Sequence, residues 1–186
     1  ELNEGMIVIT DDKEIISLGG IIGGMRSAVS EETKNVLLEA AYFDPISIAA
    51  TGRKLQINSD ARYRFERGVD PSFTLSGSHI ATKMILDLCG GEASDIIIAG
   101  SVPSFEKKII FDPKKVTQLI GIEVNRARQF EILKSLGFSV KEVENKVEII
   151  VPAWRPDVHG EVDIIEEVAR INSLANLPSI PMARKE

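Results

Sequence analysis

The pattern of apolar and polar positions divides the start of the chain into short strands and a glycine-rich connection. The runs GMIVI (5–9) and EIISL (14–18) flank TDDK, whose residues are typical of turns, so the pattern predicts a β-hairpin. GGIIGG (19–24) has four glycines in six positions, which indicates positive φ or close approach to a neighbour. Neither Gly-Lys-Ser/Thr nor G-x-G-x-x-G spacing is present, which disfavours a phosphate-binding loop. We expect a tight strand connection or a backbone segment that faces a ligand.

NVLLEAAYF (35–43) is an apolar run with one charge, Glu39, at its centre. The run predicts a strand. A carboxylate flanked by apolar residues either points to solvent from a half-buried strand, or is buried with a partner or a shifted pKa. The solvent-facing arrangement is the commoner one, and the sequence leaves both open.

Two helices and a further strand follow. Asp44 and Pro45 have the residue types of an N-cap and a first helical turn. The segment 71–91 has apolar residues at helical spacing and ends in two glycines, which predicts the clearest helix of the chain. ASDIIIAG (93–100) predicts a buried strand. SVPSFEK (101–107) mixes serine, proline and charge, as a domain boundary does.

Beyond this boundary the pattern changes to strand, helix, helix and hairpin. IIF (109–111) predicts a strand, and DPKKVTQLIG (112–121) repeats the Asp-Pro helix start. NRARQFEILKSLG (125–137) predicts an amphipathic helix that ends at its glycine. FSVKEV and KVEIIVP flank a turn at Glu144 and Asn145, as the strands of a wing would. The order of elements is that of a winged-helix domain in an α+β protein.

Composition narrows the class of protein. With 44% hydrophobic and 27% charged residues, 186 residues are enough for one large or two small domains, and we expect two. No apolar run is long enough to span a bilayer, and the first residues lack a signal-peptide pattern, so we expect no membrane association. Cys89 is the only cysteine, which excludes an internal disulfide and a thiolate zinc site and fits a cytoplasmic location.

The net charge of -6 argues against nucleic-acid binding over the whole surface, because neutralising phosphates requires lysine and arginine. The charge is unevenly distributed, however. Residues 51–68 contain five basic and two acidic residues, whereas residues 153–170 contain two basic and five acidic ones. The chain therefore has separate basic and acidic segments.

The acidic segment AWRPDVHGEVDIIEEVAR is predicted to form a helix whose acids occupy the polar half. The simplest interpretation is a solvated face on which Arg170 pairs with Glu166 at i,i+4. Asp163 and Glu167, however, are like charges at i,i+4, and Asp157 lies upstream in a loop that could fold onto this face. A hard divalent cation such as Mg²⁺ or Ca²⁺ would turn this repulsion into attraction, and a basic partner surface would do the same.

Four motifs together carry a family resemblance: LGGIIGG, NVLLEAAYFDPISI, RFERGVDP and WRPDVHGEVDIIEEVARI. They make the chain similar, over nearly its whole length, to the beta subunit of bacterial phenylalanyl-tRNA synthetase. The resemblance implies that residues 1–102 are the C-terminal part of an editing domain with a mixed sheet. It implies a winged-helix-like domain at 103–176 and a linker at 177–186. The family's beta subunit is several times longer, so we expect this chain to be a fragment.

The resemblance assigns an editing role to the first part. Editing in this family hydrolyses Tyr-tRNA. Glu39 matches the carboxylate that accepts a hydrogen bond from the tyrosine hydroxyl, and Ala61 matches a small residue that leaves room for it. Gly23 matches a pocket glycine, and Ser59 stands where the family commonly has threonine. The family's histidine and arginine that place the tRNA end have no match here, so we expect this chain alone to hydrolyse Tyr-tRNA poorly.

The resemblance also assigns partners. Asp157, Asp163, Glu166 and Glu167 match four magnesium-ligand positions, in a site shared with the alpha subunit. The assembled enzyme attaches phenylalanine to tRNA(Phe) with ATP, both bound at the alpha-subunit site. Two alternatives stay open for the second part. One is a nucleic-acid-binding module acting through Arg126, Arg128 and Lys134, and the other is a non-catalytic scaffold.

Overall fold

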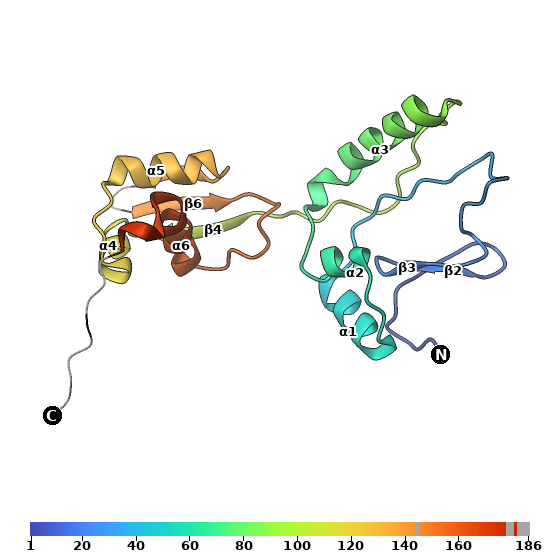
Figure 1. Cartoon of the computed structure of the whole chain (residues 1–186), viewed down its shortest axis with the longest axis horizontal. Helices are drawn as coiled ribbons and strands as arrows, with labels where there is room; N and C mark the ends of the chain where they lie inside the picture. Colours follow the sequence, from blue (N-terminus) through green and yellow to red (C-terminus); the bar gives the residue numbers. More distant parts are fainter. Residues whose placement is uncertain (144–145, 178–180, 182–186) are drawn as a thin grey trace. The chain divides into compact units, whose positions relative to one another are not determined.

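The computed structural model describes residues 1–143, 146–177 and 181, and forms two compact units, Glu1–Ser104 and Phe105–Glu186 (Figure 1). We call them unit 1 and unit 2. Each combines helices with a three-stranded antiparallel sheet, which confirms the α+β class. The linker expected at 177–186 lies outside the described residues except for positions 177 and 181.

The sheet of unit 1 contains the predicted hairpin. β1 (Val8–Thr10) pairs with β2 (Ile15–Leu18), and β2 pairs with β3 (Ile22–Gly23). Asp11 closes the hairpin turn by accepting hydrogen bonds from the backbone N–H groups of Lys13 and Glu14, both at 2.8 Å. All pairings among the described residues are antiparallel, so the expectation of a mixed sheet is wrong for this part of the chain.

The glycine-rich segment is the predicted tight strand connection. Its turn is closed by a hydrogen bond from the Ile21 N–H to the Leu18 carbonyl at 3.0 Å, and Gly20 has a φ of 66°. A Cβ on Gly19 or on Gly20 would lie 2.8 Å from the ring of Phe43. Positive φ and close approach of an aromatic ring both require glycine here.

Four helical segments follow: α1 (Pro45–Leu55), α2 (Asp60–Phe65), the short 3-10 helix η1 (Pro71–Phe73) and α3 (Thr74–Cys89). α1 begins as predicted, with an Asp44 Oδ2 that accepts a hydrogen bond from the Ser47 N–H at 2.8 Å. α3 covers the segment predicted as the clearest helix, and Gly90 follows its last residue with a φ of 72°.

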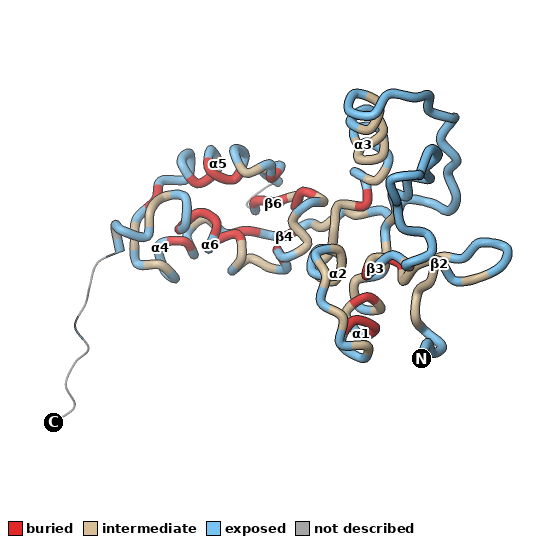
Figure 2. The backbone as a smooth tube through the Cα atoms, turned by 45° about the vertical axis from the view of Figure 1, so that its right-hand side comes forward, coloured by how far each residue is buried: buried red, intermediate tan, exposed pale blue. Residues whose placement is uncertain are grey.

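The predicted strands at 35–43 and 93–100 are absent from unit 1. Both segments are irregular and largely exposed; Leu37 is 91% and Ile97 95% exposed (Figure 2). The prediction used apolar composition, but a strand also requires a neighbour for its backbone N–H and C=O groups. Neither segment has such a partner strand among the described residues. α3 likewise buries none of its residues.

Unit 2 has the predicted order of strand, two helices and hairpin, followed by one more helix. Its elements are β4 (Lys107–Phe111), α4 (Lys114–Ile120), α5 (Arg126–Ser135), β5 (Ser139–Val143), β6 (Lys146–Val151), α6 (Glu161–Asn172) and the 3-10 helix η2 (Leu174–Asn176). β6 lies between β4 and β5 in the sheet. The turn expected at Glu144 and Asn145 lies outside the described residues.

Unit 2 has a hydrophobic core between the sheet and its helices. Alternate residues of β6 (Val147, Ile149 and Val151) face inward, and α6 contacts α4, α5 and β4 (Figure 1). Period-2 burial on the strand and a buried stripe on the helix are the expected signs of a sheet face covered by helices. Figure 2 shows the buried stretches of α5, α6 and the strands in red. Unit 2 thus has the core that a small domain needs.

Gly137, at the end of α5, lies under the indole ring of Trp154. The glycine has a φ of 89°, and a Cβ at this position would be 2.5 Å from an atom of the indole ring. Gly121, at the end of α4, has a similar φ of 72° with nothing near an added Cβ. An alanine at Gly121 would have an unfavourable backbone conformation only, whereas an alanine at Gly137 would also clash with the indole ring of Trp154.

We predict that Gly137→Ala lowers the free energy of unfolding of unit 2 by about 2–5 kcal/mol, because left-handed strain of about 1–2 kcal/mol adds to overpacking of about 1–3 kcal/mol. Gly121→Ala has only the strain of the left-handed backbone conformation, because nothing lies near an added Cβ. Urea unfolding followed by circular dichroism measures both. Equal losses for the two variants would contradict a contribution from the contact with Trp154.

Candidate functional site

In unit 1, a side-chain hydroxyl ties the start of α2 to the glycine-rich connection. Ser59 Oγ donates a hydrogen bond to the Ile21 carbonyl at 2.5 Å and accepts one from the Arg62 N–H at 3.1 Å. The second bond is an N-cap, which satisfies an otherwise unpaired N–H of the first helical turn. One hydroxyl therefore begins a helix and positions it against a loop 38 residues earlier.

Three of the four expected editing residues lie on the two segments that this hydroxyl joins. Ser59 is the cap itself, and half-buried Ala61 lies in the first turn of α2. Gly23 ends β3, two residues after Ile21, and a Cβ there would meet nothing within 4 Å. The backbone at Gly23 is thus open to approach, whereas the earlier glycines are covered by Phe43.

Glu39, the fourth expected residue, lies in the irregular segment before α1 and is exposed. Of the two arrangements that the sequence leaves open, the structure has the solvent-facing one, on an irregular segment instead of the predicted strand. The surroundings nevertheless remove enough water from the carboxylate to raise the pKa of Glu39 above its usual value. Among the described residues it has no hydrogen-bond or ion-pair partner. No hydrogen bond joins it to Gly23 or Ala61, so its role stays a prediction.

Arg62 has a structural role that the sequence reading missed. Its Nε donates to Glu66 at 2.9 Å, and its Nη1 donates to the Ile57 carbonyl at 2.7 Å and to Asn58 Oδ1 at 3.0 Å. Gly52 of α1 leaves the room, since a Cβ there would lie 2.2 Å from Arg62 Nε. The signal in the sequence was a glycine inside a helix, which often marks close packing.

The rest of the basic segment faces outward. Arg67 stacks on Tyr63, with Cζ 3.7 Å from the ring centroid, and pairs with Glu66 at 3.0 Å. Arg53, Lys54 and Arg64 are exposed, and none of them has an ion pair with another described residue. Unit 1 therefore has free positive charge on α1 and α2.

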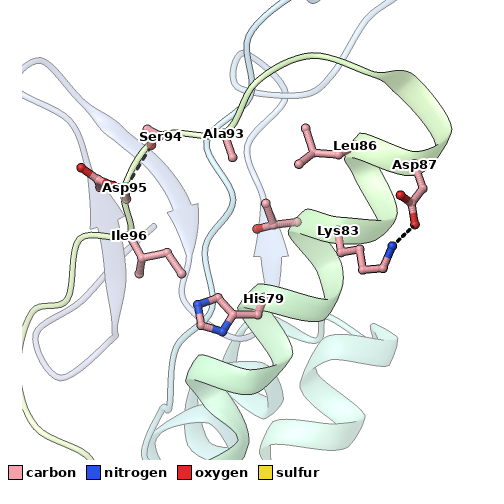
Figure 3. A pocket seen from close by; sticks show the side chains of 9 residues that line it. His79, Lys83, Leu86, Asp87, Ala93, Ser94, Asp95 and Ile96 are labelled. Atoms are coloured by element: carbon pink, nitrogen blue, oxygen red, sulfur yellow. Dashed lines mark hydrogen bonds and ion pairs between the residues drawn. The ribbon is translucent and has the colours of Figure 1, made fainter.

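α3 and the segment that follows it line an open pocket of about 510 Å³ (Figure 3). His79, Leu86 and Ile96 are among its lining residues, and a Lys83–Asp87 ion pair of 2.7 Å lies at its edge. Both partners of that pair are well exposed, so it adds little to stability. None of the four expected editing residues lines this pocket.

In unit 2, two arginines of the acidic segment pair with two of its five acids. Arg155 donates to both oxygens of Asp157, at 2.9 Å from Nε and 2.7 Å from Nη2, and Nη2 also donates to Glu167 Oε1 at 2.9 Å. Arg170 Nη2 donates to Glu167 Oε2 at 2.5 Å. The expected partner of Arg170 was Glu166, so that prediction is wrong, and the pair forms at i,i+3 instead.

These contacts lower the pKa of two carboxyl groups and raise that of the guanidinium. The hydrogen bond from Arg155 is the main cause of the low pKa of Asp157. For Glu167, burial raises the pKa, but hydrogen bonds from Arg155 and Arg170 outweigh it and lower the pKa below the usual value. The pKa of Arg155 is raised chiefly by its hydrogen bonds with Asp157 and Glu167. All three groups stay charged at neutral pH.

Asp163 caps α6 at its N-terminus. Its Oδ2 accepts hydrogen bonds from the backbone N–H groups of His159 at 2.7 Å and Gly160 at 2.9 Å, and these bonds lower the pKa of Asp163. A carboxylate at a helix N-terminus is favoured by both hydrogen bonding and the helix dipole. The repulsion expected between Asp163 and Glu167 is relieved because each carboxylate has positive or N–H partners of its own.

The remaining acids of the segment differ in their surroundings. Glu161 accepts a hydrogen bond from the Asp112 N–H at 2.8 Å and pairs with Lys115, which ties α6 to the start of α4. Glu166 is exposed and has no ion pair with a described residue.

The four expected magnesium ligands do not form a metal site in this arrangement. Among residues 1–143, 146–177 and 181, no three of His, Cys, Asp and Glu converge closely enough to hold an ion. Asp157 and Glu167 converge on a guanidinium, Asp163 on two N–H groups, and Glu166 faces outward. The donor atoms have the right chemistry for Mg²⁺, but their partners are already present.

The cations of α5, candidates for nucleic-acid binding, are mostly engaged as well. Arg126 pairs with Glu142 at 2.9 Å and lies 5.2 Å from the ring of Phe130. Arg128 pairs with Glu131 at 2.8 Å. Only Lys134 of the three lacks an ion pair among the described residues, so the helix presents little free charge to a phosphate backbone.

Comparison with known proteins identifies both units. Residues 1–90 match the family model of the B3/4 domain, and residues 109–173 match that of the tRNA synthetase B5 domain. A B3/4 domain followed by a B5 domain places the chain in the class of aminoacyl-tRNA synthetase components.

Curated relatives narrow the class to one family. The chain is 52% identical over 186 residues to the phenylalanine–tRNA ligase beta subunit of Cereibacter sphaeroides, and 51% identical over 183 residues to that of Paramagnetospirillum magneticum. These matches cover 100% and 98% of the chain but only 23% of each relative. The chain belongs to the family of phenylalanine–tRNA ligase beta subunits, and spans about a quarter of their length. None of the helices in its described part has the length and apolarity needed to cross a membrane.

We predict that the stability of unit 2 falls as the pH falls below about 4.5, near the ordinary values for Asp and Glu. The folded-state pKa values of Asp157, Asp163 and Glu167 are lowered, so their stabilisation is present above the unfolded pKa values and is lost as pH falls through the folded ones. Asp163→Asn makes the decline shallower, by about 1 kcal/mol for a charged cap.

Amide hydrogen exchange of β6 between pH 6 and pH 3, corrected for the intrinsic exchange rate, measures this stability. Asp12→Asn, which removes an exposed carboxylate of unit 1, serves as the matched control. A pH profile for Asp163→Asn that coincides with that of the unsubstituted chain would rule out the charged cap as a source of the dependence.

Proposed function

We propose that this chain is the part of a phenylalanyl-tRNA synthetase beta subunit that contributes a proofreading pocket from unit 1 and an alpha-facing scaffold from unit 2. The observation that carries the proposal is the full-chain identity of about half to beta subunits, over a B3/4 and a B5 domain. The whole enzyme, with its alpha subunit, attaches phenylalanine to tRNA(Phe) using ATP in the cytoplasm. ATP and phenylalanine bind at the alpha-subunit site.

Proofreading is needed because an amino-acid-binding pocket can select phenylalanine over tyrosine only to a limited extent. Tyrosine differs from phenylalanine by one hydroxyl, and an apolar pocket rejects an added hydroxyl by only about a hundredfold. A second pocket that hydrogen-bonds this hydroxyl discriminates in the opposite direction, because phenylalanine would leave the pocket's polar group without a partner. Hydrolysis of Tyr-tRNA in such a pocket removes the error.

Glu39 has the chemistry for this recognition. A carboxylate is an acceptor without a donor of its own at neutral pH, so it pairs with a phenol hydroxyl and not with an aryl hydrogen. Its raised pKa reflects partial loss of water, which strengthens any hydrogen bond made there. The Ser59 hydroxyl supports the pocket by fixing α2, and therefore Ala61, against the loop that leads to Gly23. The open backbone at Gly23 leaves space for substrate.

Unit 2 serves in this proposal as a scaffold toward the alpha subunit. Its compact core and its internally paired acidic segment are features of a packing module. The magnesium site expected at Asp157, Asp163, Glu166 and Glu167 is proposed only for the assembled enzyme. In this chain Asp157, Asp163 and Glu167 have arginine or backbone N–H partners instead.

We predict that Glu39→Ala in the complete enzyme, with both subunits present, lowers the rate of Tyr-tRNA(Phe) hydrolysis by about tenfold to hundredfold. The reason is the loss of a hydrogen bond to a charged acceptor, worth about 1.5–3 kcal/mol. Aminoacylation with phenylalanine stays unchanged. Deacylation of preformed Tyr-tRNA(Phe) and charging of tRNA(Phe) are measured on the same preparation.

Glu31→Ala is the matched control, since it removes an exposed carboxylate from the same irregular region. It leaves both rates as they were. Full hydrolysis by the Glu39→Ala enzyme would remove Glu39 from the mechanism and leave unit 1 with the role of a scaffold.

A further inference from the structure

Arg155 occupies the place between two carboxylates where a cation would be expected. Its guanidinium binds both oxygens of Asp157 and one oxygen of Glu167, with donor–acceptor distances of 2.7–3.2 Å. Asp157 belongs to the loop before α6 and Glu167 to the middle of α6. One planar group therefore bridges two segments of unit 2, as the fork geometry of arginine allows.

Glu167 depends on this bridge because it is buried. Only 7% of the residue is exposed, and each carboxylate oxygen has one arginine donor: Arg155 at Oε1 and Arg170 at Oε2. A buried carboxylate without a cation would be strongly unfavourable. Some positive group must therefore neutralise Glu167 whenever unit 2 is folded.

We propose that Arg155 is an internal substitute for a divalent cation, so that Mg²⁺ can bind Asp157 and Glu167 only after the guanidinium has been displaced from them. That the ion is Mg²⁺ rests on the proposed function, which includes a magnesium site at these residues. The role of Arg155 rests on the geometry alone. Arg155 is thus a positioning residue that keeps the acidic segment folded in the metal-free state.

Charge and space make the two occupants mutually exclusive. Mg²⁺ requires carboxylate oxygens at about 2.0–2.1 Å in an octahedral arrangement. The Asp157 and Glu167 oxygens that would have to turn toward the ion now accept hydrogen bonds from Arg155. A guanidinium left within the same pair of carboxylates would repel the ion.

The surroundings show how Arg155 can leave without unfolding the loop. Its backbone N–H donates to the Pro152 carbonyl at 3.0 Å, and its own carbonyl accepts from the Val158 N–H at 3.4 Å. These bonds hold the main chain independently of the guanidinium. Cζ lies 5.9 Å from the ring of Phe138, so the side chain is not locked by close stacking. Displacement therefore requires rotation of one side chain.

The test compares divalent-ion binding by the 186-residue chain and its variants, with Mn²⁺ as the probe and its electron paramagnetic resonance signal as the measure of free ion. Arg155→Gln removes the guanidinium and keeps a polar side chain. Arg128→Gln is the matched control: it removes the same charge from an exposed pair with Glu131. Ionic strength is held constant, and Mg²⁺ competition confirms that the site accepts both ions.

We expect Arg155→Gln to bind one Mn²⁺ at least tenfold more tightly than the unsubstituted chain, a difference of about 1.4 kcal/mol. Arg128→Gln behaves as the unsubstituted chain does. Equal or weaker binding by Arg155→Gln overturns the competition while leaving the metal site intact. Binding by neither protein overturns the competition, whereas the magnesium site proposed for the assembled enzyme and the editing role of unit 1 are unaffected by this result.

Arg155→Lys covers the case in which Arg155→Gln does not fold. Lysine keeps the positive charge but is a point donor that cannot bridge Asp157 and Glu167 as a planar fork does. We expect Mn²⁺ binding several-fold tighter than in the unsubstituted chain. Unchanged or weaker binding by this folded variant would overturn the proposal on its own.

Discussion

The folded state of unit 2 depends on neutralising one buried carboxylate. Glu167 lies on the inner side of α6 next to apolar residues that include Ile164 and Val168, and charge at such a position is tolerated only with opposite charge in contact. Arg155 and Arg170 provide it. Because Arg155 also binds Asp157, the same requirement closes the loop 152–160 onto the helix. Arg155 therefore both neutralises the buried carboxylate and holds the loop against α6.

The two units differ in how completely they bury their apolar residues. Unit 2 has a continuous core drawn from its sheet and helices. In unit 1 the buried hydrophobic residues are Ile21 and Ile48, whereas α3 and the segment 93–100 expose most of theirs. Since burial of apolar surface is the main driving force of folding, unit 2 has the stronger internal basis for a stable fold.

The sequence predicted local structure well where local chemistry determines it. Asp44 begins α1 as an N-cap, the glycines at 19–20 make a tight connection, and the helices of unit 2 occupy the expected segments. Strands at 35–43 and 93–100 were predicted from apolar composition and are wrong. A strand depends on hydrogen bonds from a neighbour, which composition does not report. Local signals were reliable, and non-local pairing was not.

For the candidate site the sequence identified residue types but not partners. It singled out the acids at 157, 163, 166 and 167. Arg155 lies in the same motif, but the sequence does not indicate that it bridges Asp157 and Glu167. Spacing predicted Glu166 as the partner of Arg170, whereas burial selects Glu167. Similarly, Ser59 was singled out by resemblance, but its bond to the Ile21 carbonyl depends on tertiary structure. Which oxygen meets which donor is decided by packing.

The contact between Trp154 and Gly137 has an optical consequence. Trp154 is the only tryptophan in the chain, and it directly precedes Arg155 in the loop that closes on α6. Its indole lies against a bare backbone on one side while more than half of the residue faces solvent. Tryptophan fluorescence of this chain, excited where its two tyrosines do not absorb, thus arises from one ring next to the arginine bridge. Its emission wavelength and quenching by iodide report the state of that loop without any added label.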